Sequence, residues 1–125
     1  MIRVLFLPLV IATVLVLSFG YGAWRVGTHA VQRASSEREH ALASDLDAQR
    51  RLADCYRVGC PAAHRSLVLT CAWRLVIAEE THGDPKDVAE ASKDCDGLGE
   101  RERLSASMAK DELLHRLDDA RKRHL

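Results

Sequence analysis

The four cysteines are the side chains whose number and spacing give the clearest chemical indication. Cys55, Cys60, Cys71 and Cys95 are the only cysteines of the 125-residue chain. An even number of cysteines in a small domain that follows an export-type apolar segment indicates two disulfides. Three pairings are possible, and the sequence alone does not choose among them. Helix geometry should gather all four at one end of a helical bundle, and we favour Cys55–Cys71 together with Cys60–Cys95.

Other cysteine chemistries fit the spacing less well. A four-thiolate zinc site normally shows two close C-x(2–4)-C pairs, whereas Cys55 and Cys60 lie at the wide edge of that range and Cys71 and Cys95 stand alone. A protein that exchanges thiols and disulfides normally carries a C-x-x-C motif, and this sequence has none. In a cytoplasmic domain the four would instead be buried free thiols. We therefore expect structural disulfides, with no metal and no cofactor.

The remaining polar residues do not form a catalytic pattern. The six histidines are scattered, and the common hydrolase, dinucleotide-binding and P-loop motifs are absent. Glu80 and His82 lie at the end of a predicted helix and are expected to face solvent. Arg74 interrupts an apolar helix, where we expect an exposed edge, a pairing with an acid such as Asp54 or Glu90, or a recognition role. The sequence thus predicts that the protein is not an enzyme.

The elements that must position these residues are all expected to be helices, because strand-like alternation is absent and apolar residues recur at helical spacing. Ser44, Ser66 and Asp84 are predicted N-caps, and Gly59 and Gly83 are predicted stops. The second predicted helix is the most apolar and should be the central core helix. Short loops favour antiparallel packing of helices that follow one another in the chain. The predicted ranges are Asp45–Val58, Leu67–Thr81, Pro85–Cys95 and Glu100–Arg121.

The first two of these helices carry a recognisable pattern. They read Ala48-x3-Leu52-Ala53-x2-Tyr56-x2-Gly59, and then Leu69-x-Cys71-Ala72-Trp73-x4-Ala78. This pattern resembles a single Sel-one-like repeat, a relative of the tetratricopeptide repeat, over residues 48–80. Ala53 replaces a usual glycine, and Cys60-Pro61 replaces the usual loop residues. The resemblance implies protein–protein interaction or scaffolding, and it carries over no catalytic residue.

An apolar segment precedes the helical part. Val4–Trp24 contains no charged residue, and as a helix it would span about 30 Å, the thickness of a bilayer hydrocarbon core. We predict a transmembrane anchor over residues 1–25, a tether over 26–43 and a helical domain over 44–125. A cleaved secretory signal is the alternative, with small residues near Gly20 or Ala30 as cleavage sites.

Charge and cysteine content bear on where the helical domain lies. The chain has 18 basic and 18 acidic side chains, and the part after Arg25 is slightly acidic, which argues against nucleic-acid binding. The basic residues Arg25, Arg33 and Arg38 follow the apolar segment and by themselves would place the domain in the cytoplasm. Disulfides require an oxidising compartment. Giving the cysteines more weight, we predict a single-pass inner-membrane protein with its C-terminal domain in the periplasm.

The expected function follows from placement and architecture. We expect a membrane-anchored, extracytoplasmic protein–protein interaction module or an accessory subunit of a membrane complex. Its partner would use the apolar segment or the helix pair that carries Tyr56, Trp73 and Arg74, and no small-molecule substrate is evident. The alternatives are a secreted, soluble helical protein after signal cleavage and a redox-responsive sensor whose cysteines control helix docking.

Overall fold

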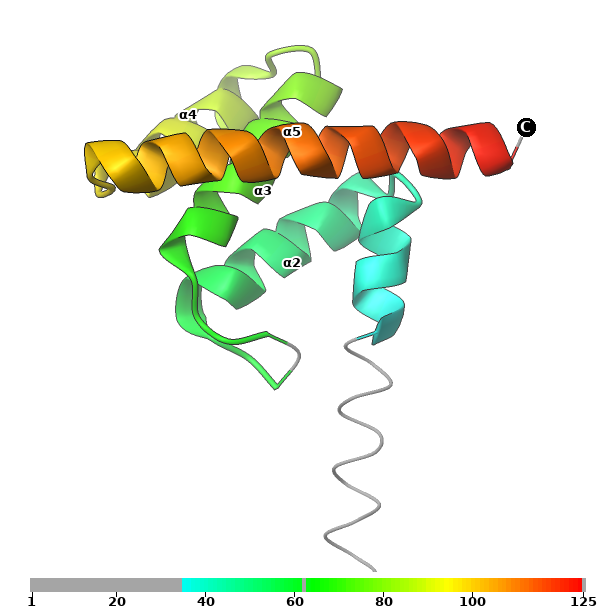
Figure 1. Ribbon diagram of the computed structural model, residues 1–125, viewed down its shortest axis with the longest axis horizontal. Coiled ribbons are helices and arrows are strands. Elements are labelled where there is room, and N and C mark those ends of the chain that lie inside the picture. The colour runs from blue at the N-terminus through cyan, green and yellow to red at the C-terminus, as the bar shows by residue number, and fades with distance from the viewer. Residues whose placement is uncertain (1–34, 62, 125) are drawn as a thin grey trace, which may run out of the picture. The chain divides into compact units, whose positions relative to one another are not determined.

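The computed structural model describes residues 35–61 and 63–124, and all of the regular structure in these ranges is helical. Residues 35–42 form a short helical stretch, followed by four longer helices (Figure 1). These helices are α2 (Leu46–Val58), α3 (Leu67–Glu80), α4 (Pro85–Asp96) and α5 (Glu100–Arg123). The all-α prediction is thus confirmed for the described residues. The predicted anchor, Val4–Trp24, lies outside them, and no helix within them is both long and apolar enough to cross a bilayer.

Local capping sets the beginning of each helix. Ser66 accepts a hydrogen bond from the Leu69 amide at 3.2 Å at the start of α3. Asp84 caps α4, and Pro85 takes the first position of that helix, as predicted. The predicted cap of α2 was one residue off: Asp45, not Ser44, accepts from the amides of the first turn. The physical reason is that Ser44 has a φ of +67° and therefore belongs to the preceding turn.

Two glycines end helices in left-handed conformations. Gly59 follows α2 and Gly83 lies just beyond α3, each with a φ of +81°. Side chains are rarely tolerated at such φ values, so glycine lets the chain reverse there without strain. Both predicted stops are confirmed, and together with the caps they explain why the predicted ends of α2, α3 and α4 differ little from the observed ones.

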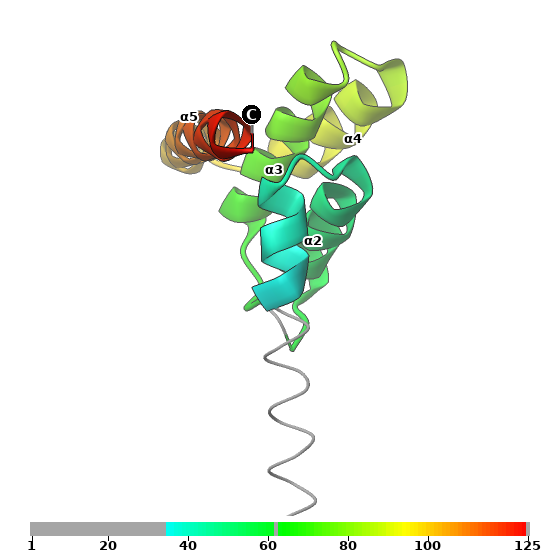
Figure 2. The same cartoon turned by 90° about the vertical axis from the view of Figure 1, so that its right-hand side faces the viewer.

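The helix α3 is central, and α2, α4 and α5 each pack against it (Figures 1 and 2). One apolar cluster joins α2 and α3 to the end of α5 through Leu52, Ile77 and Leu117. A smaller cluster joins α3 to the turn before α5 through Cys71, Leu98 and Ala106. The predicted role of α3 as the core helix is confirmed. The expectation that chain neighbours pair throughout is wrong for α5, which lies across α3 instead of beside α4.

Residues 35–42 belong to the folded unit, which corrects the predicted tether over 26–43 for the part that the structure describes. Ala41 is completely buried in the main cluster, and Leu42 packs against it. The side-chain amide nitrogen (Nε2) of Gln49 donates a 3.0 Å hydrogen bond to the Ala41 carbonyl. Glu37 forms an ion pair with Arg51. Within the described part of the chain, the compact unit therefore already includes residues 35–43, which precede the predicted boundary at residue 44.

All four cysteines form disulfides, as predicted, but the favoured pairing is wrong. The bonds are Cys55–Cys60, with Cα atoms 5.3 Å apart, and Cys71–Cys95, with Cα atoms 5.0 Å apart. The reversal at Gly59 brings Cys60 back to the last turn of α2, where Cys55 is the nearest partner. Cys71 lies on the side of α3 that faces Cys95 and Leu98. Cys55, which was expected to join α2 to α3, is therefore bonded to the turn that follows its own helix.

Candidate interaction cleft

A cleft of about 290 Å³ opens between α5, α2, α3 and the helical residues 35–42. Its walls are mainly apolar, and its rim carries three charged side chains. The apolar wall residues are Leu42, Leu52, Tyr56, Leu69, Trp73, Ala109 and Leu113, and the charged residues are Arg38, Glu112 and Arg116. An apolar hollow with a few polar groups at its edge is the usual form of a binding site. We therefore treat this cleft as the candidate functional site.

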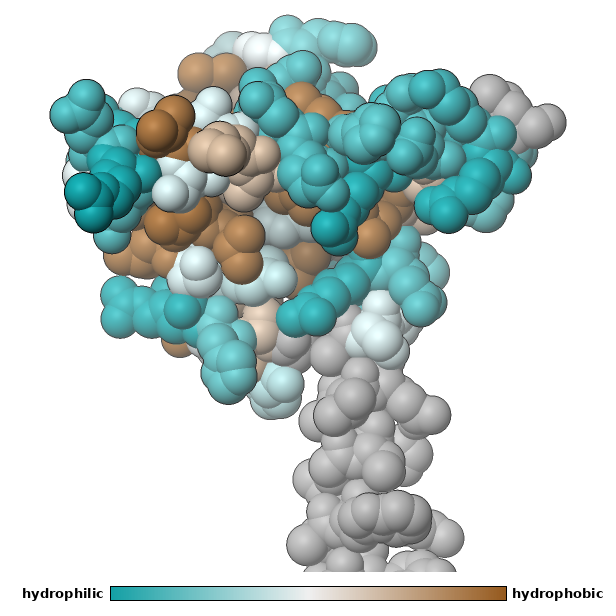
Figure 3. Space-filling view, viewed as in Figure 1, coloured by the Kyte–Doolittle hydropathy of each residue, from teal (hydrophilic) through white to brown (hydrophobic). Residues whose placement is uncertain are grey.

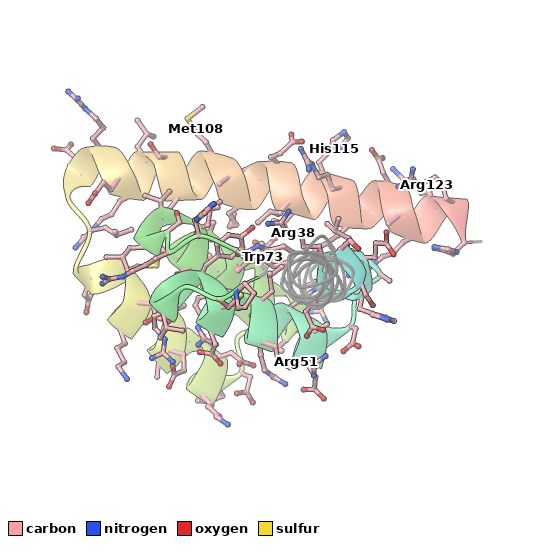
Figure 4. The ribbon with its side chains drawn as sticks, turned by 90° about the horizontal axis from the view of Figure 1, so that it is seen from below. Arg38, Arg51, Trp73, Met108, His115 and Arg123 are labelled. Atoms are coloured by element: carbon pink, nitrogen blue, oxygen red, sulfur yellow. A yellow bond between two sulfur atoms is a disulfide. The ribbon has the colours of Figure 1, made fainter. Side chains whose placement is uncertain are left out.

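Two of the three residues predicted to form an interaction surface line this cleft. Trp73 is only 4% exposed and belongs to the main core cluster, so it forms the floor rather than an exposed surface. Tyr56, one turn along α2 from Leu52, is half-buried. Figure 4 labels Trp73 and Arg38 on the side of α5 that carries the cleft. The helix pair suggested by the sequence thus supplies the base of the cleft.

The third predicted surface residue, Arg74, has a structural position. Its side chain is 7% exposed, which corrects the prediction of an exposed edge or a recognition surface. Its guanidinium donates to Asp54 at 2.8 Å and to Asp94 at 2.9 Å, and lies 3.8 Å from Glu90. The predicted pairing with Asp54 or Glu90 is confirmed. Arg74 therefore joins α2, α3 and α4 in one ionic cluster, in which Arg74 and Asp94 are buried and Asp54 and Glu90 are partly exposed.

A second ionic contact joins α2 to α4 beside the core. Arg50 donates to both carboxylate oxygens of the buried Asp87, with distances of 3.2 and 2.8 Å, and also contacts Asp47. The hydrogen bonds from Arg50 lower the pKa of the Asp87 carboxyl, and this effect exceeds the opposing effect of burial. Such forked pairs fix helix geometry as well as charge. No pattern in the sequence predicts this contact, because it depends on how α4 packs.

The cleft includes residues that the sequence did not indicate. Arg38 and Leu42 come from the segment interpreted as a tether, and Glu112 and Arg116 come from the exposed part of α5. Arg116 donates to Glu112 at 2.8 Å, one turn away on the same helix. For Arg38 and Leu42, the only sequence signal was a short apolar stretch within a polar segment. This stretch is Ala41-Leu42, close to Leu46.

None of the histidines in the described part of the chain lines the cleft. His82 is exposed beyond α3, and His115 lies on the exposed side of α5, 3.5 Å from Asp119. Among residues 35–61 and 63–124, no cluster of three or more acidic, cysteine or histidine side chains is arranged to hold a metal ion. The arrangement at the cleft is suited to holding an apolar group between charged edges.

Comparison with known proteins adds no family assignment: no family model, no curated protein and no solved structure matches this chain.

Proposed function

We propose that this protein is an interaction module, held at a membrane by Val4–Trp24, whose helical domain binds a protein partner in the cleft under α5. The observation that carries the proposal is the cleft itself, with apolar walls from three long helices and residues 35–42. It is a preformed hollow of a size to take one or two apolar side chains of a partner segment. The charged residues at its edge would orient that segment.

Placement outside the cytoplasm is supported by the cysteines. Both pairs are disulfide-bonded, and disulfides persist in oxidising compartments such as the bacterial periplasm. The uncharged run Val4–Trp24 supports membrane attachment. The proposal therefore places a disulfide-bonded domain on the periplasmic side of an inner membrane, as an accessory subunit of a membrane complex. The resemblance of residues 48–80 to a Sel-one-like repeat fits the same role.

Membrane attachment is tested by fractionation. Full-length protein in the alkali-resistant membrane pellet supports the anchor. A shortened form in the soluble fraction, beginning near Tyr21 or Val31, would instead support a secreted protein. Non-reducing mass measurement of the exported protein should find no free thiol, and four free thiols would contradict the proposed compartment.

Binding in the cleft is tested with a substitution that fills it without removing core packing. Ala109 lines the cleft from α5 and is partly exposed, so A109E places a larger, charged side chain at the opening while keeping a good helix former. We expect A109E to abolish capture of a partner from mild-detergent extracts. The matched control is S107E, an exposed position of the same helix outside the cleft, which should retain the partner. Equal capture by both variants would exclude the cleft as the binding site.

A further inference from the structure

The outer side of α5 carries two large apolar residues that the fold leaves uncovered. Leu104 is 63% exposed and Met108 is 66% exposed, whereas Ala106, between them in sequence, is completely buried against the second cluster. Figure 4 shows Met108 projecting away from the other helices. In Figure 3 apolar surface interrupts the hydrophilic covering of the N-terminal half of α5. This pair is therefore not part of the core and lies apart from the cleft residues.

Opposite charges flank this apolar pair along the same side of the helix. Arg101 precedes Leu104 by three residues, and Asp111 follows Met108 by three, so the four residues alternate at spacings of three, four and three. This is the spacing of a helix–helix contact stripe. Arg101 is exposed and forms no ion pair with another described residue. The side chain of Asp111 is 71% exposed, and its neighbour Lys110, at 3.5 Å, also contacts Glu79.

We propose that this outer stripe (Arg101, Leu104, Met108 and Asp111) is a homodimer contact, in which the α5 helices of two copies cross antiparallel. A two-fold axis at the middle of the stripe places Leu104 against Met108 of the partner subunit. It also places Arg101 against Asp111 of the partner subunit. The stripe is thus complementary to itself, as a two-fold interface requires.

The order of charges selects the antiparallel arrangement. In a parallel pair, Arg101 would lie beside the partner's Arg101, and Asp111 beside the partner's Asp111. Like charges at such positions repel and disfavour that pairing. The interface consists of a single helix crossing, which is small for a stable complex, so we expect dimers whose population depends on concentration. The contact uses neither the cleft nor the apolar segment and does not rest on the proposed function.

The test uses charge reversal in the full chain, with sedimentation equilibrium in density-matched neutral detergent at low ionic strength. R101D makes both ends of the stripe acidic, and D111R makes both ends basic. Each variant alone should dimerise about tenfold more weakly than the wild type. An equimolar mixture of the two should recover wild-type affinity to within about threefold, because each introduced charge then faces its opposite.

Matched variants control for nonspecific effects. K86D reverses an exposed charge on α4 and should dimerise like the wild type, and circular dichroism should show equal helicity for all variants. R101D introduces an acid near the N-terminus of α5, where the helix dipole favours it, so folding should not be lost. A monomer at all concentrations, unchanged dimerisation of R101D, or a mixture no tighter than its components would each overturn the proposal. Unchanged dimerisation of R101D would place the contact elsewhere, for example in the apolar segment.

Discussion

At the scale of single residues, the notable feature is that charged side chains are buried beside the small apolar core. Arg74 and Asp87 are both more than nine-tenths buried, yet each has an oppositely charged partner within hydrogen-bond distance. Buried charge is costly unless it is paired. These two residues therefore fix the positions of α2, α3 and α4 relative to one another, beyond what the apolar contacts alone require.

Removing the central cation should be strongly destabilising. R74M keeps most of the side-chain volume but leaves Asp94, whose side chain is 8% exposed, without its partner. We expect the free energy of unfolding to fall by about 3 kcal/mol, because an uncompensated buried charge remains. The matched control is K122M, which breaks an exposed one-turn ion pair with Asp118 and should leave the free energy of unfolding nearly unchanged. Urea denaturation of both variants measures the difference, and equal losses would contradict the structural role of Arg74.

The contact between Arg50 and Asp87 should give stability a defined pH dependence. Because the pKa of Asp87 is lowered in the folded state, this stabilisation is present above the unfolded pKa of about 4. It should be lost as the pH falls through the folded-state pKa. Arg50 is partly exposed, so we expect D87N to cost only about 1–2 kcal/mol at pH 7.

The measurement for D87N is urea denaturation of wild type and variant at a series of pH values. The difference in unfolding free energy should be constant from pH 5 to pH 8, by the same linkage argument, and should shrink below about pH 4. D47N, which removes a largely exposed carboxylate near the same arginine, should show a much smaller difference. A difference that grows with acidity would contradict the assigned direction of the pKa change.

At the scale of elements, the two disulfides constrain different parts of the fold. Cys55–Cys60 closes the turn after α2, whereas Cys71–Cys95 joins α3 to α4 across a separation of 24 residues. Longer closed loops restrict the unfolded chain more strongly. The second bond also lies beside Leu98, where the chain turns into α5, so it helps to position the helix that covers the cleft.

Removing each bond separately should reveal this difference. By loop-closure entropy, the double substitution C71S/C95S should cost about 3.5 kcal/mol and C55S/C60S about 2 kcal/mol. Denaturation of the two variants under identical non-reducing conditions gives the comparison. Cysteine pairing itself is checked by peptide mapping of the wild type. Recovery of a Cys55–Cys71 peptide would contradict the structure, and a larger loss in C55S/C60S would contradict the entropic ranking.

At the scale of the whole molecule, the folded unit begins earlier than a reading of composition indicates. Residues 35–42 are rich in polar side chains, yet Ala41 is fully buried and Leu42 lines the cleft. This short helical stretch packs back onto α2 and so supplies one wall of the cleft. A segment between an apolar run and a domain can thus line a cleft of that domain.

This boundary can be tested with two alanines that lie two residues apart. A41D places a charge in the main cluster and should lower the free energy of unfolding by about 3 kcal/mol or more. A43D, at an exposed position two residues away, should change it by no more than about 0.5 kcal/mol. Thermal or urea unfolding distinguishes the two. If both substitutions were neutral, residues 35–43 would be a tether after all.

The sequence by itself determined the features that depend on local interactions. Caps and stops act only on the end of their own helix, so the positions of α3 and α4 followed from residue type. The residues concerned are Ser66, Asp84 with Pro85, Gly59 and Gly83. The central place of α3 followed from its predominantly apolar composition. An even cysteine count predicted two disulfides. These rules hold because caps, stops and hydrophobic content need only the neighbouring residues.

The tertiary structure decided whatever depends on which faces meet. Cys71 paired with Cys95 because its side of α3 faces α4 and the turn into α5, and spacing along the chain carries no such information. Arg74 became buried because Asp54 and Asp94 approach it from two other helices. The cleft exists because α5 crosses α3 at a distance from α2, leaving apolar side chains partly uncovered. Contacts between residues far apart in sequence are fixed by the packing of whole helices, and one sequence read alone does not contain that packing.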